Sequence, residues 1–314
     1  MNLLASLRYL AALDEHKHFG RAALACHITQ PALSNALRAL EKEFGTTIVN
    51  RGRSFAGFTA EGARVLVSAQ RMLRERELLQ QDLNSVAGKP QGMLTIGAVP
   101  TAVPIAARFA AMLHARHSGI SPVVRSMSSA ELENGLATLV LDMGLGYTDR
   151  LARYSPRLRH VAQYIEDYFL VCRAAEPFTD GLEVGSNISW LDASRLPLCL
   201  LSSEMHNRTL IDQAFAEVGV VVKPAIETNS ILTLVLSVSA GDVCSVVPGA
   251  LIGAFRGFRE LQARPLVSPE LRTTIGFMLQ GGDRTSRTLD AAMTLAQDAA
   301  WLRQAAMHSG LLAA

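Results

Sequence analysis

Four polar side chains in the stretch HITQPALSNALRALEKEFG are spaced so that they share one face of a helix. They are Gln30, Ser34, Asn35 and Arg38, and residues three or four apart lie above one another on a helix. A Gln or Asn amide can form two hydrogen bonds with adenine, and an Arg guanidinium can pair with guanine or hold a phosphate. This face therefore has the chemistry needed to read base edges in a DNA major groove.

The same stretch carries the signals that begin and end such a helix. Thr29 can cap the first turn, and Pro31 fits there because its missing N–H is not needed. Leu33, Leu37 and Leu40 form an apolar inner face, and the pattern ends near Gly45. We therefore expect Gln30 and Pro31 at a helix start whose free N–H groups can face a phosphate.

The neighbouring segments complete a DNA-binding unit. Apolar residues at spacings of three and four predict a helix over residues 3–15, and RAALAC predicts a short second helix that ends at about His27. Two short helices joined by a tight turn are typical of a helix-turn-helix. The tip GRSFAG then predicts a hairpin wing, in which Arg51 and Arg53 would contact the DNA backbone or the minor groove.

These DNA contacts have simpler alternatives. Gln30 and Ser34 could be merely solvated, and Arg53 could be an ordinary surface charge. Arg38 could instead pair with Glu41 or Glu43 on its own helix.

A long helix should follow the wing. Thr59 can cap it, and the chain from Ala63 to Ala87 contains neither Pro nor Gly. A seven-residue repeat on this segment favours a partner helix, with packing on the chain's own second domain as the alternative; its members are Val65, Met72, Leu79 and Val86.

After the hinge GKPQG the pattern changes to short apolar runs that alternate with helical segments. This alternation is typical of βαβ units around a parallel sheet. We predict an α+β multidomain protein with a DNA-binding domain, a linker helix and a two-lobed α/β domain, whose bounds are 1–59, 60–88 and 89–314. Lobe I would hold about 92–162 and 267–306, and lobe II about 163–266.

Composition excludes several classes of protein. The 314 residues are 49% apolar and 18% charged, with a net charge of +2, which describes a globular chain. The N-terminus does not form a convincing signal peptide, and no apolar run reaches eighteen residues, so we expect a cytoplasmic protein without membrane contact. The four cysteines show no CxxC spacing, and we expect neither a zinc site nor a disulfide framework.

An enzyme is not indicated. The chain has no GxSxG, HExxH, P-loop or dinucleotide-binding glycine pattern, and its eight His residues are scattered. We expect no catalytic residue, no metal ligand and no cofactor other than a small-molecule effector. A solute-binding protein would explain the two α/β lobes but would leave residues 1–87 without a role.

The chain resembles the LysR-type transcriptional regulators over its whole length. The most specific part is HFGRAALACHITQPALSNALRALEKEFGTTIVNRGRSFAGFTAEG, although Asn35, Ile48, Val49 and Phe58 depart from the commonest pattern. The resemblance implies a winged helix-turn-helix, a dimerising linker helix and an effector domain similar to type 2 periplasmic binding proteins. It further implies double-stranded DNA with a partial palindrome, a homodimer or homotetramer, and RNA polymerase as partners.

Small hydroxyls and amides follow the predicted strands of the effector domain. Ligands of open α/β sheets bind outside the carboxyl ends of the strands, and N–H groups at helix starts suit a small anion or carboxylate. The candidate effector contacts are Pro100, Thr101, Ser128, Ser129, Ser202, His206, Asn207 and Thr228.

Each of these has an alternative. Ser129 and Asn229 could simply cap helices, and His206 could be a surface or capping residue. Some members of the resembled family sense oxidants through cysteines in the corresponding loop, but residues 202–209 contain none. Cys199 lies in an apolar run without a neighbouring base, so oxidant sensing is disfavoured.

Overall fold

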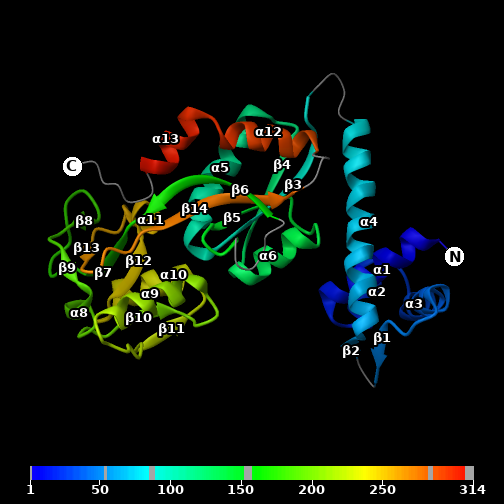
Figure 1. Cartoon of the computed structure of the whole chain (residues 1–314), viewed down its shortest axis with the longest axis horizontal. Helices are drawn as coiled ribbons and strands as arrows, with labels where there is room; N and C mark the ends of the chain where they lie inside the picture. Colours follow the sequence, from blue (N-terminus) through cyan, green and yellow to red (C-terminus); the bar gives the residue numbers. More distant parts are fainter. Residues whose placement is uncertain (1, 53–54, 85–88, 152–157, 282–285, 308–314) are drawn as a thin grey trace. The chain divides into compact units, whose positions relative to one another are not determined.

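The computed structural model describes residues 2–52, 55–84, 89–151, 158–281 and 286–307 (Figure 1). Its contacts divide the chain into two units, which are described separately: Met1–Val86 with Thr138–Val140, and Ala87–Ala137 with Leu141–Ala314. No helix in the described part of the chain is both long and apolar enough to span a membrane.

The first unit begins with three helices, as predicted. They are α1 (Leu3–His16), α2 (Phe19–Ala25) and α3 (Gln30–Phe44). The Thr29 hydroxyl accepts from the Ala32 amide at 3.4 Å, and Gly45 ends α3 in a left-handed conformation with φ of 63°. The buried leucines of α1 and α3 form one core with Ala22 and Ala23 of α2.

A two-stranded wing follows, formed by β1 (Val49–Arg51) and β2 (Phe55–Phe58). The Glu41 carboxylate of α3 accepts from the backbone amides of Ile48 at 3.0 Å and Val49 at 3.1 Å. Hydrogen bonds to a charged group are stronger than neutral ones. Glu41 therefore fixes the start of the wing to α3.

The long helix α4 (Ala60–Asn84) begins directly after the wing. The Thr59 hydroxyl accepts from the Gly62 amide at 2.8 Å, which confirms the predicted cap. Leu66 and Ala69 are buried against the three-helix core, whereas Met72 and Leu79 are 47% and 58% exposed. Val86, the last member of the predicted repeat, lies outside the described residues.

The first lobe of the second unit is built on a five-stranded sheet in the order β4-β3-β5-β14-β6. Strands β3 (Gly92–Ala98), β4 (Ile120–Ser126) and β5 (Met143–Tyr147) are parallel, as predicted, and β14 (Thr273–Gln280) and β6 (Leu158–Glu166) add antiparallel ladders. The connecting helices are the short 3-10 helix η2 (Pro100–Ala102), α5 (Val103–Arg116) and α6 (Ser129–Ala137).

The second lobe contains a second five-stranded sheet and a separate strand pair. Strand β7 (Tyr168–Arg173) lies between β12 (Ser245–Pro248) and β13 (Leu261–Val267), and the short strands β8 (Glu183–Val184) and β9 (Ile188–Ser189) pair with β13. Strands β10 (Cys199–Leu201) and β11 (Ile226–Thr228) are parallel. The helices of this lobe are α8 (Trp190–Ala193), α9 (His206–Glu217), α10 (Ile231–Ala240) and α11 (Gly249–Phe255).

The chain crosses between the lobes twice. It leaves the first sheet from β6 to β7 and returns from β13 to β14, so that these strands continue from one lobe into the other (Figure 1). Arg272 of the return crossing donates to Asp167 of the first crossing at 3.0 Å. This ion pair joins the two crossings.

The final helix predicted over residues 284–306 is wrong as a single element. The structure has two helices, α12 (Arg287–Ala296) and α13 (Ala299–Met307). The Asp298 carboxylate accepts from the amides of Ala300 and Trp301. Because Asp favours helix starts, it begins a new helix at the point where the apolar pattern alone continues.

The expected absence of a disulfide is also wrong. Cys172 and Cys244 are bonded across 72 residues of sequence, whereas Cys26 and Cys199 are free. Spacing along the sequence cannot reveal this pair, because the pairing of β7 with β12 brings the two cysteines together.

Candidate functional site

The outer face of α3 presents the predicted DNA contacts. Gln30, Pro31, Asn35 and Arg38 are exposed and Ser34 is half-buried, opposite the buried Leu33, Leu37 and Leu40. Arg38 donates to the side-chain oxygen of Asn35 at 3.3 Å. These two side chains are thus held together on the face that the sequence assigned to base reading.

The wing arginines cannot be placed as precisely. The backbone of Arg51 belongs to β1, and the prediction for Arg53 lies outside the described residues. Their proposed backbone contacts therefore remain predictions.

A small cavity between the two lobes collects five of the predicted effector residues. They are Pro100, Thr101, Ser129, His206 and Asn207, and Val99, Tyr147, Leu201 and Met205 complete the lining. The space among these side chains is about 10 Å³, which is room for about one water molecule. The lobes therefore meet closely here.

Tyr147, at the end of β5, is the hydrogen-bonding centre of this cavity. Its hydroxyl lies 3.1 Å from the Thr101 hydroxyl and accepts from the Asn207 amide at 3.3 Å. Burial raises the pKa of Tyr147, and the nearby Glu166 raises it further. Tyr147 is therefore a neutral hydroxyl that links η2 of lobe I to α9 of lobe II.

Ser128 and Ser129 have different roles. The Ser128 hydroxyl accepts from the Glu131 amide at 3.3 Å and its own amide donates to the Glu131 carboxylate at 2.8 Å, so Ser128 caps α6. The Ser129 hydroxyl is buried and has no hydrogen-bond partner among the described residues. Ser129, not its neighbour, is therefore available to a ligand.

Three predicted contacts do not line the cavity. Ser202 donates to Glu204 at 2.7 Å, and the Thr228 hydroxyl accepts from the Ser230 amide at 3.1 Å. Neither they nor Ser128 belong to the lining. Ser230 caps α10 by accepting from the Thr233 amide, so Asn229 is not the cap that the sequence suggested.

His206 lies at the edge of the cavity between charged groups. Its ring nitrogens are 3.3 Å from Asp149 and 3.3 Å from Arg150, and its ring meets that of Tyr147 edge-on at 5.0 Å. The hydrogen bond from His206 lowers the pKa of Asp149. His206 thus connects α9 to the loop after β5.

A buried carboxyl group lies beyond Tyr147. Glu166 is 0% exposed, and neither carboxyl oxygen has a hydrogen-bond partner among the described residues. Burial raises the pKa of Glu166 well above its ordinary value of 4.5. The protonated form is therefore favoured near the cavity.

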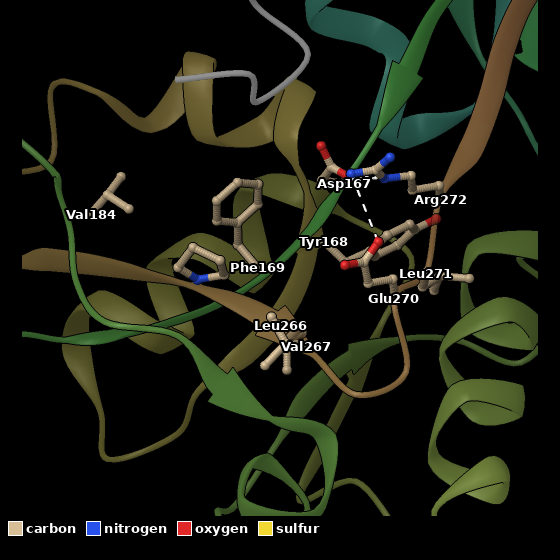
Figure 2. Close-up of a pocket in the computed structure, with 10 residues that line it drawn as sticks. Asp167, Tyr168, Phe169, Val184, Leu266, Val267, Glu270, Leu271 and Arg272 are labelled. Atoms are coloured by element: carbon tan, nitrogen blue, oxygen red, sulfur yellow. Dashed lines mark hydrogen bonds and ion pairs between the residues drawn. The ribbon is translucent and has the colours of Figure 1, made fainter. Parts of the chain in front are cut away.

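A second, more open pocket of about 300 Å³ lies beside the lobe crossings (Figure 2). Asp167, Glu270 and Arg272 gather on one side of it, and Arg272 is 3.0 Å from Asp167 and 3.9 Å from Glu270. Leu271 and apolar side chains from β7, β8 and β13 form the remaining wall. The charged groups here pair with one another. The pocket therefore has fewer unpaired polar groups than the cavity for hydrogen bonds to a ligand.

Sequence reasoning missed Tyr147, Leu201, Met205 and Val99. A signal for Tyr147 exists, because it ends the run MGLGY and the carboxyl ends of parallel strands meet at one sheet edge. The apolar residues carry no comparable signal, since Val, Leu and Met are common in cores.

Comparison with known proteins identifies the class. Residues 4–63 match the bacterial regulatory helix-turn-helix protein, lysR family, and residues 87–301 match the LysR substrate binding domain. The chain belongs to the LysR family. It is a DNA-binding transcriptional regulator that responds to an effector, and not an enzyme.

Individual relatives are similar over most of their length. The DNA-binding transcriptional dual regulator OxyR of Escherichia coli K12 is 27% identical over 288 residues, covering 89% of this chain and 90% of the relative. The SDS degradation transcriptional activation protein of a Pseudomonas strain is 28% identical over 315 residues, covering 95% and 96%.

Solved structures confirm the fold. A full-length OxyR variant from Pseudomonas aeruginosa covers 99% of this chain and 98% of its own, with a TM-score of 0.67 at 22% identity. CbnR in complex with its target DNA covers 96% and 99%, with a TM-score of 0.65 at 18% identity.

Proposed function

We propose that the effector is a small molecule with a hydrogen-bond acceptor, such as a carboxylate or oxoanion, and that it binds in the cavity around Tyr147. The observation that carries this proposal is Ser129, a buried hydroxyl without a partner that faces the cavity lining. A buried donor left unpaired costs about 1–3 kcal/mol, so an acceptor beside it is favoured.

The helix starts around the cavity support the same chemistry. Helices α5 and α9 begin there without a side-chain hydrogen bond to their first turn, and α6 begins at Ser129. The positive end of a helix dipole favours an anion. Among the described residues that line the cavity, none carries a carboxylate, and burial raises the pKa of Glu166 behind it, which disfavours its charged form.

Binding must widen the cavity, because its present space suits only about one water molecule. The contacts that would separate are those between the lobes, chiefly Asn207 with Tyr147 and His206 with Arg150. The effector would thereby change the contacts between the lobes. We infer that this change is transmitted to the DNA-binding unit.

A thermal-shift screen of small carboxylates and oxoanions tests the effector proposal. A ligand at a hundred times its dissociation constant adds about 2.7 kcal/mol of stability. Thr101→Val and Ser129→Ala should reduce the shift, whereas Ser202→Ala, outside the cavity, should keep it. A full shift in both cavity variants would contradict the proposal.

We further infer a cytoplasmic homodimer or homotetramer that binds a partly palindromic DNA site and contacts RNA polymerase. The exposed side chains of Met72, Leu79 and Leu83 on α4 support self-association, since apolar surface is favoured when covered. Two copies of α3 in a dimer would address two half-sites about one helical turn apart.

A further inference from the structure

The disulfide in lobe II lies at a point where three strands meet. Ser245 pairs with Val171 in the antiparallel ladder of β12 and β7, so the preceding Cys244 faces Cys172, at a Cα–Cα distance of 4.4 Å. A separation of about 4.5 Å is usual for directly opposed residues of an antiparallel pair that share no backbone hydrogen bonds. The backbone can therefore hold the two sulfurs together whether they are bonded or not.

Cys244 also connects this sheet to the neighbouring strand pair. Its amide donates to the Pro197 carbonyl at 2.9 Å, and its carbonyl accepts from the Cys199 amide at 2.8 Å, at the start of β10. The disulfide thus ties β7 to the point where β10 and β12 come together.

The segment after Cys244 leads to the lobe interface. Strand β12 runs directly into α11, whose first amide, that of Gly249, donates to the Asp167 carbonyl at the first crossing. Helix α11 packs against η2, which carries Thr101 of the cavity. Only strand β12 separates Cys244 from α11, which packs against an element that lines the cavity.

The two sulfurs differ in access. Cys172 is half-buried and Cys244 is 8% exposed, so an incoming thiolate reaches Cys172 more readily. The free cysteines are poorer reaction partners, because burial raises the pKa of both the Cys26 and the Cys199 thiols and the thiolate is the reactive form.

The compartment matters for such a bond. A DNA-binding regulator works where the DNA is, and the cytosol of most cells keeps thiols reduced, so disulfides found there are usually transient or redox-sensing. We propose that Cys172 and Cys244 are a site of reversible exchange with low-molecular-weight thiols and disulfides, and that this exchange controls how firmly β12 and α11 are held.

The reaction balances without any further reagent. A monothiol, as its thiolate, attacks the Cys172 sulfur and forms a mixed disulfide, and Cys244 leaves as a thiolate that takes up a proton. A second monothiol attacks the outer sulfur of the mixed disulfide, releasing Cys172 as a thiol and one low-molecular-weight disulfide. The reverse reaction with that disulfide restores the protein bond.

This inference does not rest on the effector proposal, and its test needs no effector. The full-length wild-type chain is equilibrated in buffers that range from only reduced to only oxidised glutathione. It is then quenched with acid, alkylated and mapped by mass spectrometry. We expect Cys172 and Cys244 to pass together between disulfide and dithiol within this range, while Cys26 and Cys199 remain thiols.

Either of two results would overturn the exchange site. A pair that stays bonded in reduced glutathione alone would be a structural disulfide. A pair that stays reduced in oxidised glutathione alone would be two buried thiols.

Amide hydrogen exchange tests the effect on the fold. Reduction should speed exchange in residues 245–255 and leave α3 unchanged as an internal control. Cys172→Ser and Cys244→Ser should each show the faster exchange in every buffer. Equal protection of residues 245–255 in the oxidised and reduced wild type would contradict control of β12 and α11, and this readout does not depend on how the variants fold.

Discussion

The side-chain amide of Asn207 donates to the hydroxyl of Tyr147 over 3.3 Å, and this bond joins the first turn of α9 in lobe II to the last residue of β5 in lobe I. Both residues are buried, and the Thr101 hydroxyl is 3.1 Å from the same oxygen. Buried hydrogen-bond networks of this kind specify one arrangement of their elements when their members are paired.

Removal of the Tyr147 hydroxyl should therefore destabilise the effector domain. Tyr147→Phe leaves the Asn207 amide unpaired, and we expect a loss of about 1–3 kcal/mol in urea unfolding. Ser245→Ala is a control, because the Ser245 hydroxyl is also buried but has no hydrogen-bond partner among the described residues. If Ser245→Ala lowers the free energy of unfolding as much as Tyr147→Phe does, the network does not hold the lobes.

Glu166 should make stability fall as pH rises. Burial raises its pKa well above 4.5, so above that pH the folded chain binds more protons at this site than the unfolded chain, and the free energy of unfolding decreases with pH. Glu166→Gln should remove this pH dependence. Its free energy of unfolding should exceed that of the wild type by the largest amount at neutral pH. The measurement is urea unfolding from pH 4 to pH 8, with the exposed Glu75→Gln as control. If the difference in the free energy of unfolding between Glu166→Gln and wild type is the same at every pH, the raised pKa of Glu166 is contradicted.

Gly62 should tolerate no side chain although it lies in a helix. A Cβ there would be 2.0 Å from the Ile48 carbonyl oxygen. Helix propensity alone predicts that Gly→Ala gains about 1 kcal/mol. We expect Gly62→Ala to lower the midpoint of thermal unfolding, because the added methyl group would force the backbone at Ile48 and α4 apart. A gain would show that the two backbones are not in such close contact.

Charge on the exposed stripe of α4 should weaken self-association. Met72 and Leu79 are about half-exposed, and a dimer that covers them cannot accept two buried carboxylates. Met72→Glu with Leu79→Glu should give a smaller species than wild type in sedimentation velocity. An unchanged sedimentation coefficient would place the association surface elsewhere.

The elements of the DNA-binding unit could be predicted because their signals are local. Thr29, Pro31 and Gly45 act within a few residues of the helix ends that they define, and the leucine spacing shows which face is buried. The role of Glu41 could not be predicted in this way, since its partners Ile48 and Val49 lie in the next element.

The effector cavity was only partly predictable. Thr101 and Asn207 follow strand ends, where ligand sites of α/β sheets are expected. The use of Ser128 as a cap and Ser129 as a free hydroxyl depends on which backbone amide each oxygen reaches, and the sequence does not specify this. The Cys172–Cys244 pair depends on the ladder between β7 and β12, which brings together two cysteines 72 residues apart in the sequence.

Helix α3 reads the DNA sequence if the side chain of Gln30 contacts a base, and Gln30→Ala removes that contact. Binding is measured by salt-titrated anisotropy on a duplex selected from a random pool by the wild-type chain and on its scrambled counterpart. Gln30→Ala should cost about 1–3 kcal/mol on the selected duplex and little on the scrambled one, because base contacts carry discrimination. Lys42→Ala, an exposed charge at the far end of α3, should affect both duplexes alike. Equal losses on both duplexes for Gln30→Ala would contradict the claim.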